Sequence, residues 1–228
     1  DPIGSSDYFK TNTDDLQLMA IDQSINLNSS DYQACLGELH LRFNSGDLSI
    51  RNLKLFPLHG AQAIADSKTY NADVVSLEIE ALNVHGLDFD DLLLEQNILI
   101  DSIMIDQANV DIFKDKNKPF DMNKRPKLIH QKLKHSNNDI AIGQISLTNS
   151  SLHYVEKNPG KDNTVVDLTN LTAQINHLDN TQTEGTVDPM TIALEGIVLN
   201  AVPFDITLTF SDVLKSDYFR FKGSTGSS

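Results

Sequence analysis

Apolar and polar residues alternate with a period of two along most of the chain. Near its C-terminal end, Phe204, Ile206 and Leu208 are separated by single polar residues, and 39–43 and 75–82 show the same alternation. This period predicts half-buried β-strands. One-sided alternation is typical of an antiparallel sheet with one apolar and one polar face.

Two hairpin-like stretches, 98–112 and 140–154, resemble each other at a constant offset of 42 residues. A shorter echo of the pattern lies at 47–55. Self-similarity at a fixed offset indicates a stacked, elongated architecture rather than a closed globule. The sequence therefore predicts a mainly β fold, an elongated, curved antiparallel sheet that is groove- or solenoid-like and built from repeated hairpins.

The second half of the chain divides into short strands and two short helices. The helices are expected at about 89–96, where several Asp residues suit the first turn, and at 124–135, where Pro126 suits the first turn. Pro57 to Ala65 is expected to be an irregular or helical link. The strands are expected at 98–105, 109–114, 140–147, 150–156, 164–178, 190–200, 203–211 and 217–222.

We expect a single elongated β domain over 7–222. The Gly- and Ser-rich ends, 1–6 and 223–228, are expected to be linkers or expression-derived ends. No stretch of about 18 apolar residues occurs, so the sequence predicts no transmembrane helix.

The net charge of −14 disfavours nucleic-acid binding, which normally requires a basic surface. The charge is uneven, because 114–135 holds eight Lys and Arg against two acids. The simplest interpretation is a solvated basic segment. The alternative is a contact for phosphate head groups or an acidic partner, with candidate residues Lys124, Arg125, Lys127, Lys132 and Lys134.

Sequence signatures of catalysis are absent. The chain contains no phosphate-binding Gly loop, no G-x-S-x-G and no H-E-x-x-H. His130 and His135 are five residues apart and so lie on different helix faces, and the histidines are expected to be solvated. Asp90 and Asp91 are interpreted as helix-capping residues rather than a metal pair. We therefore expect no enzymatic activity, no catalytic residues, no metal and no cofactor.

The stretch from about Leu77 to Asp179 resembles the AsmA-like (TamB-related) family of bacterial envelope proteins, especially Bacteroidetes-like members. The resemblance is carried by an ordered set of motifs: the turn and short helix at 82–93, the strands at 100–103 and 108–116, the loop and helix from Pro119 through Pro126, and the strands at 142–156 ending Tyr154-Val155-Glu156. Membership would imply a periplasmic β-groove that passes phospholipid. It would also imply an inner-membrane anchor in a part of the protein outside this chain.

Two functional hypotheses follow. The first is a non-enzymatic periplasmic segment that binds or conducts phospholipid or another acyl lipid along an apolar groove in cell-envelope biogenesis. The second is a structural or adhesive β-module with a closed core and no lipid ligand. The residues expected to line the groove are Ile100, Ile103, Ile105, Ile142, Ile145, Leu147, Phe204, Ile206 and Leu208.

Overall fold

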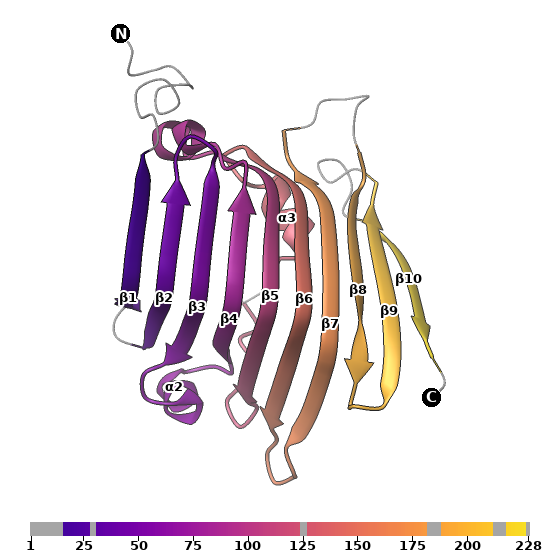
Figure 1. Ribbon diagram of the computed structural model, residues 1–228. Coiled ribbons are helices and arrows are strands. Elements are labelled where there is room, and N and C mark those ends of the chain that lie inside the picture. Colours follow the sequence, from indigo (N-terminus) through magenta and orange to yellow (C-terminus); the bar gives the residue numbers. More distant parts are fainter. Residues whose placement is uncertain (1–15, 28–30, 124–126, 182–187, 212–217, 227–228) are drawn as a thin grey trace.

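The computed structural model describes residues 16–27, 31–123, 127–181, 188–211 and 218–226. These residues form one ten-stranded sheet in which each strand lies beside its neighbours in sequence (Figure 1). The sheet does not close on itself, and the predicted mainly β fold is confirmed. The strands are β1 (Gln17–Leu27), β2 (Tyr32–Arg42), β3 (Asp47–Pro57), β4 (Asp73–His85), β5 (Ile98–Asp115), β6 (Ile140–Lys157), β7 (Thr164–Asp179), β8 (Met190–Val198), β9 (Val202–Phe210) and β10 (Arg220–Thr225).

The helices are short, as expected. They are α2 (Ala61–Ser67), the π-helical turn η2 (Asp91–Glu95) and α3 (Ile129–Lys134). Asp90 and Asp91 were expected to cap η2, but Asp88 does so: its Oδ1 accepts hydrogen bonds from the backbone N–H groups of both, and the side chain of Asp90 makes no capping hydrogen bond. The helix predicted over 124–135 is shorter than expected, and 124–126 lie outside the described residues.

The link expected over Pro57 to Ala65 is helical in its second part, because α2 begins at Ala61, directly after Gly60. One boundary differs from the prediction. β10 runs on to Thr225, because Ser224 and Thr225 pair with Asp205 and Phe204 of β9. Part of the expected C-terminal linker therefore belongs to the sheet.

The repeated stretches form the one parallel pair among the described strands. β5 and β6 pair Ile98 with Ile140 and Ile112 with Tyr154, which reproduces the offset of 42 residues found in the sequence. The prediction of two hairpins was wrong, since each stretch is one continuous strand of 18 residues. Parallel neighbours need a crossover connection, and residues 116–139 supply it by returning from the end of β5 to the start of β6.

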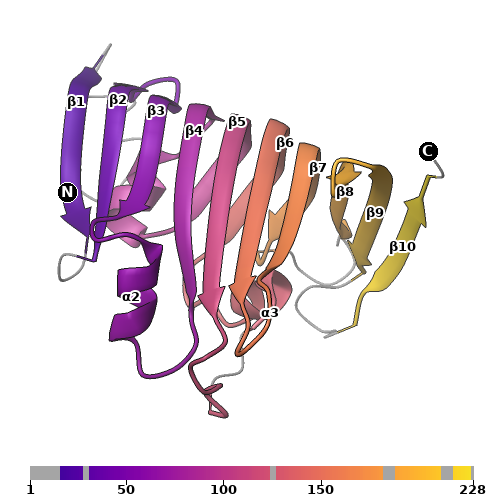
Figure 2. The same ribbon diagram turned by 90° about the horizontal axis from the view of Figure 1, so that it is seen from below.

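A row of residues with left-handed backbone crosses the middle of the sheet. Asp22, Asn52, Gln107, Asn149 and Asn170, on β1, β3, β5, β6 and β7, have φ between 50° and 53°. Asn and Asp adopt this conformation more readily than other non-glycine residues. Bulged strands bend, and Figure 2 shows the strands bent in this way.

The spacing of apolar residues changes at this row. Inward-facing positions step by three instead of two across it, from Ile105 to Ala108 on β5 and from Leu147 to Ser150, a buried polar residue, on β6. Leu147 and Ser150 are three residues apart on β6, but their partners on β7, Ala173 and Leu171, are only two apart. β6 therefore carries an extra residue there. An extra residue shifts the alternation by one. The apolar side chains therefore stay on the same face of the sheet on both sides of the bend.

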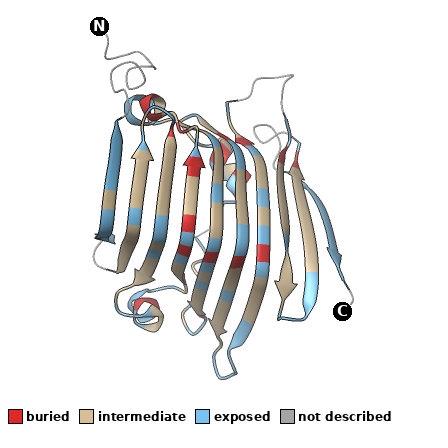
Figure 3. Ribbon diagram, in the orientation of Figure 1, coloured by how far each residue is buried: buried red, intermediate tan, exposed pale blue. Residues whose placement is uncertain are grey.

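Burial at the bend shows which face is concave. Ile79, Ala108, Ser150 and Leu171, on β4 to β7, are buried and appear as a band across these strands (Figure 3). The residues with left-handed backbone that adjoin this band, such as Asn149 beside Ser150, are exposed. Side chains inside a bend are crowded by their neighbours, whereas those outside it are spread apart. The apolar face is therefore the concave one.

Asn52 tests the role of the left-handed row. Asn52→Val should lower the free energy of unfolding by about 1–2 kcal/mol, because a β-branched residue is strained at positive φ. Asn52→Gly should be tolerated, since glycine adopts this conformation freely. Chemical unfolding of both variants checks the prediction, and equal stability of the two would contradict it.

Candidate functional site

Three unbroken rows of apolar residues cross the concave face. Directly paired residues point to the same side of a sheet, so each row follows from the strand register. The first row is Leu18, Leu41, Leu48, Val84, Ile103, Ile145, Ile175, Ile192, Leu208 and Phe221. The second is Ala20, Leu39, Ile50, Leu82, Ile105, Leu147, Ala173, Leu194, Ile206 and Gly223. The third, beyond the bend, is Ile25, Ala34, Leu55, Leu77, Val110, Leu152, Leu168, Val198 and Val202.

We call these rows together the apolar face. Val84 is the one buried member of the three rows, and the others are half-buried or exposed. A sheet face packed against a second layer would bury most of its side chains. The apolar face is thus largely uncovered by the rest of the described chain.

The convex face has a different composition. The row between the first two apolar rows is Met19, His40, Ser49, Asn83, Met104, Ser146, Gln174, Ala193, Thr207 and Lys222. Most of its members are polar, so the sheet is amphipathic across its full width.

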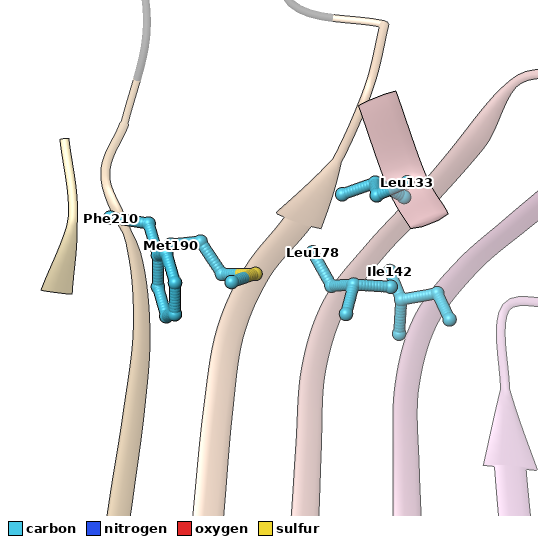
Figure 4. Close-up of a cluster of buried hydrophobic side chains, with 5 residues drawn as sticks. All are labelled: Leu133, Ile142, Leu178, Met190 and Phe210. Atoms are coloured by element: carbon cyan, nitrogen blue, oxygen red, sulfur yellow. The ribbon is translucent and has the colours of Figure 1, made fainter. Parts of the chain in front are cut away.

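One end of the apolar face is covered. Leu133 of α3 packs with Ile142, Leu178, Met190 and Phe210 from four strands (Figure 4). Leu87 and Phe89, just before η2, form a second cluster with Val84. Both clusters lie towards the end of the sheet where β5 and β6 begin.

This cover divides the predicted groove residues into two groups. The members packed in the cluster beneath α3 are Ile100, Ile103, Ile142, Ile145 and Leu208. The members that are half-buried and belong to no buried cluster are Ile105, Leu147, Phe204 and Ile206. The residues that β1 to β4, β7, β8 and β10 contribute to the rows were not predicted, although the alternation along most of these strands carries the same signal.

A pocket of about 290 Å³ lies where the apolar face reaches β10. Phe204, Ile206 and Phe221 line it together with the backbone around Gly223. Two of the predicted groove residues, Phe204 and Ile206, thus line the same pocket at the β10 end of the apolar face.

Charged groups gather at the opposite end, where β5 ends. Asp115 is buried and accepts hydrogen bonds from Gln62 Nε2 and from the backbone and side chain of Asn117. These hydrogen bonds, that of Gln62 first, hold the pKa of Asp115 well below its usual range. Asp115 therefore stays ionised and ties the start of the 116–139 connection to α2.

The lysines of the basic segment have different surroundings. Lys114 pairs with Asp73 at 3.0 Å and Lys116 with Glu156 at 2.7 Å. Lys127 and Lys132 are exposed and have no carboxylate partner among the described residues. Of the other head-group candidates, Lys134 is half-buried, and Lys124 and Arg125 lie outside the described residues.

His130 contradicts the expectation of solvated histidines. Its side chain is fully buried, and neither ring nitrogen has a hydrogen-bond partner among the described residues. The ring lies against Phe210, with 4.8 Å between the ring centroids. His130 and Leu133 are three residues apart in α3, so their side chains lie on the same side of the helix, and this side packs on the sheet.

Comparison with known proteins adds no relative. No family model matches the chain, and no curated protein matches it. Within the described residues, no helix is long and apolar enough to cross a membrane, and no three His, Cys, Asp or Glu side chains are placed to hold a metal ion. The AsmA-like resemblance stays a prediction from the sequence motifs.

Replacing His130 tests its unusual environment. His130→Leu should raise the free energy of unfolding by about 1 kcal/mol, because it removes buried polar atoms that lack partners. For a domain of this size the melting temperature should rise by roughly 2–4 °C. His135→Leu, at an exposed position on the same segment, is the control. A clear loss of stability in His130→Leu would show that the ring has a partner.

Proposed function

We propose that this chain binds acyl lipid along the apolar face, as a segment of a cell-envelope protein that binds or conducts phospholipid. The observation that carries the proposal is the set of apolar rows that crosses the sheet without a charged interruption and is mostly uncovered. The envelope location, the periplasm and an anchor elsewhere in the protein rest on the resemblance to the AsmA-like family.

The shape of the apolar face favours a chain-like ligand. Ligands held in discrete pockets are oriented by a few converging polar groups, whereas the three rows consist of aliphatic side chains with one Phe and a terminal Gly. At about 4.8 Å between strands, the first two rows, which span all ten strands, are about 43 Å long. One leaflet of a bilayer has a hydrocarbon depth of about 15 Å. The face could therefore hold acyl chains end to end, as lipid conduction requires.

A structural or adhesive module remains the alternative function. The version predicted from the sequence had a closed core, but the sheet is open over the described strands. A role without lipid would need another protein to cover the apolar face. Exposed apolar surface of this extent is rare on monomeric proteins without a binding role.

Charge placed on either face of β9 tests the proposal. Ile206→Asp should abolish binding of a fluorescent fatty acid, because an unpaired carboxylate is costly beside an acyl chain. Thr207→Asp, the neighbouring position on the convex face, should leave binding unchanged. Leu147→Asp and Ser146→Asp form the same comparison on β6. Native mass spectrometry of protein purified without detergent should show bound lipid in the wild type and convex-face variants only.

Thermal unfolding of the same four variants completes the experiment. Folded Ile206→Asp and Leu147→Asp proteins without lipid would support the proposal. Unfolding of both apolar-face variants, together with wild-type protein free of lipid, would favour the structural module.

A further inference from the structure

The 116–139 connection presents apolar and basic side chains outward from α3. Leu128 and Ile129 are 53% and 42% exposed, although both are large and apolar. Lys132 lies one turn further along and is also exposed. Since His130 and Leu133 face the sheet, these three residues form the outer side of α3.

One further residue of the connection extends this surface. Lys127, which directly precedes Leu128, is exposed as well. We call Lys127, Leu128, Ile129 and Lys132 the connection patch. It combines two large apolar side chains with two lysines that have no carboxylate partner among the described residues.

The patch is unusual for this protein. The chain carries a net charge of −14 and would be repelled by an anionic surface over most of its area. The lysines at the start of the connection are paired, Lys114 with Asp73 and Lys116 with Glu156. Lys127 and Lys132, by contrast, have no carboxylate partner among the described residues and lie beside the exposed Leu128 and Ile129.

We propose that the connection patch docks the protein on an anionic lipid bilayer. Apolar side chains bordered by lysines suit the interface of such a bilayer, where they enter the acyl boundary and the ammonium groups meet phosphates. This inference deepens the proposed function, on which it rests. The inner side of α3 packs on the end of the apolar face, so docking there places the bilayer next to the proposed lipid path.

Vesicle flotation tests the proposal directly. The protein should bind vesicles of equal parts phosphatidylcholine and phosphatidylglycerol and bind pure phosphatidylcholine vesicles less well. Binding to the anionic vesicles should weaken as salt is raised. Each lysine contributes a factor of about five near an anionic surface, so Lys127→Gln/Lys132→Gln should bind about 25-fold more weakly.

Matched variants separate the patch from general surface effects. Lys161→Gln/Lys222→Gln removes the same charge from exposed sites elsewhere and should bind as the wild type does. Leu128→Ser/Ile129→Ser should lose binding to the anionic vesicles, whereas Leu199→Ser, which alters a 58% exposed residue after β8, should not.

The outcomes distinguish this inference from the proposed function. Ile206→Asp should lose the fluorescent fatty acid but keep vesicle binding, because the patch is intact. Equal vesicle binding by patch and control variants, or no wild-type binding to anionic vesicles, would overturn the docking inference. Fatty-acid binding by the wild type in that case would leave the proposed function standing.

Discussion

A bent strand must keep its apolar side chains on one face, and the rest of this structure depends on how that constraint is met. Strict alternation would fail wherever a bulge inserts an extra residue, because every later side chain would change sides. Here the apolar pattern also shifts by one at the bulge, since the apolar residues on either side of it on β6, Leu147 and Leu152, are an odd number of positions apart. The shifts lie side by side across the sheet, so the strands bend along one line. The result is a single concave apolar face instead of two half-apolar ones.

The parallel pair at the centre then determines which part of that face is covered. Because β5 and β6 run in the same direction, the chain must return over the length of the sheet through 116–139. The end of this connection, α3, seals one end of the apolar face with Leu133 and a buried His130. Leu87 and Phe89 cover a second part beside Val84, and most of the rest of the face is uncovered by the described residues. The same topological feature thus provides a packed cluster, an open apolar surface and the outward patch on α3.

Much of this fold could be predicted from the sequence, but its central features could not. Alternation located most strands of the second half, and the offset of 42 residues matched the register of β5 and β6. It was interpreted as a hairpin repeat because periodicity cannot distinguish a turn from a bulge. The burial of His130 could not be predicted either, since it depends on α3 docking against Phe210, which is distant in sequence.

The most direct test of the central claim is to map where an acyl chain contacts the protein. A fatty acid with a photoreactive diazirine on its tail can be bound, irradiated and located by peptide mass spectrometry. A lipid-binding apolar face should be labelled at the uncovered residues Ile105, Leu147 and Ile206, and their convex-face neighbours should not be labelled. Labelling confined to the convex face, or no labelling above that of an unfolded control, would contradict the claim.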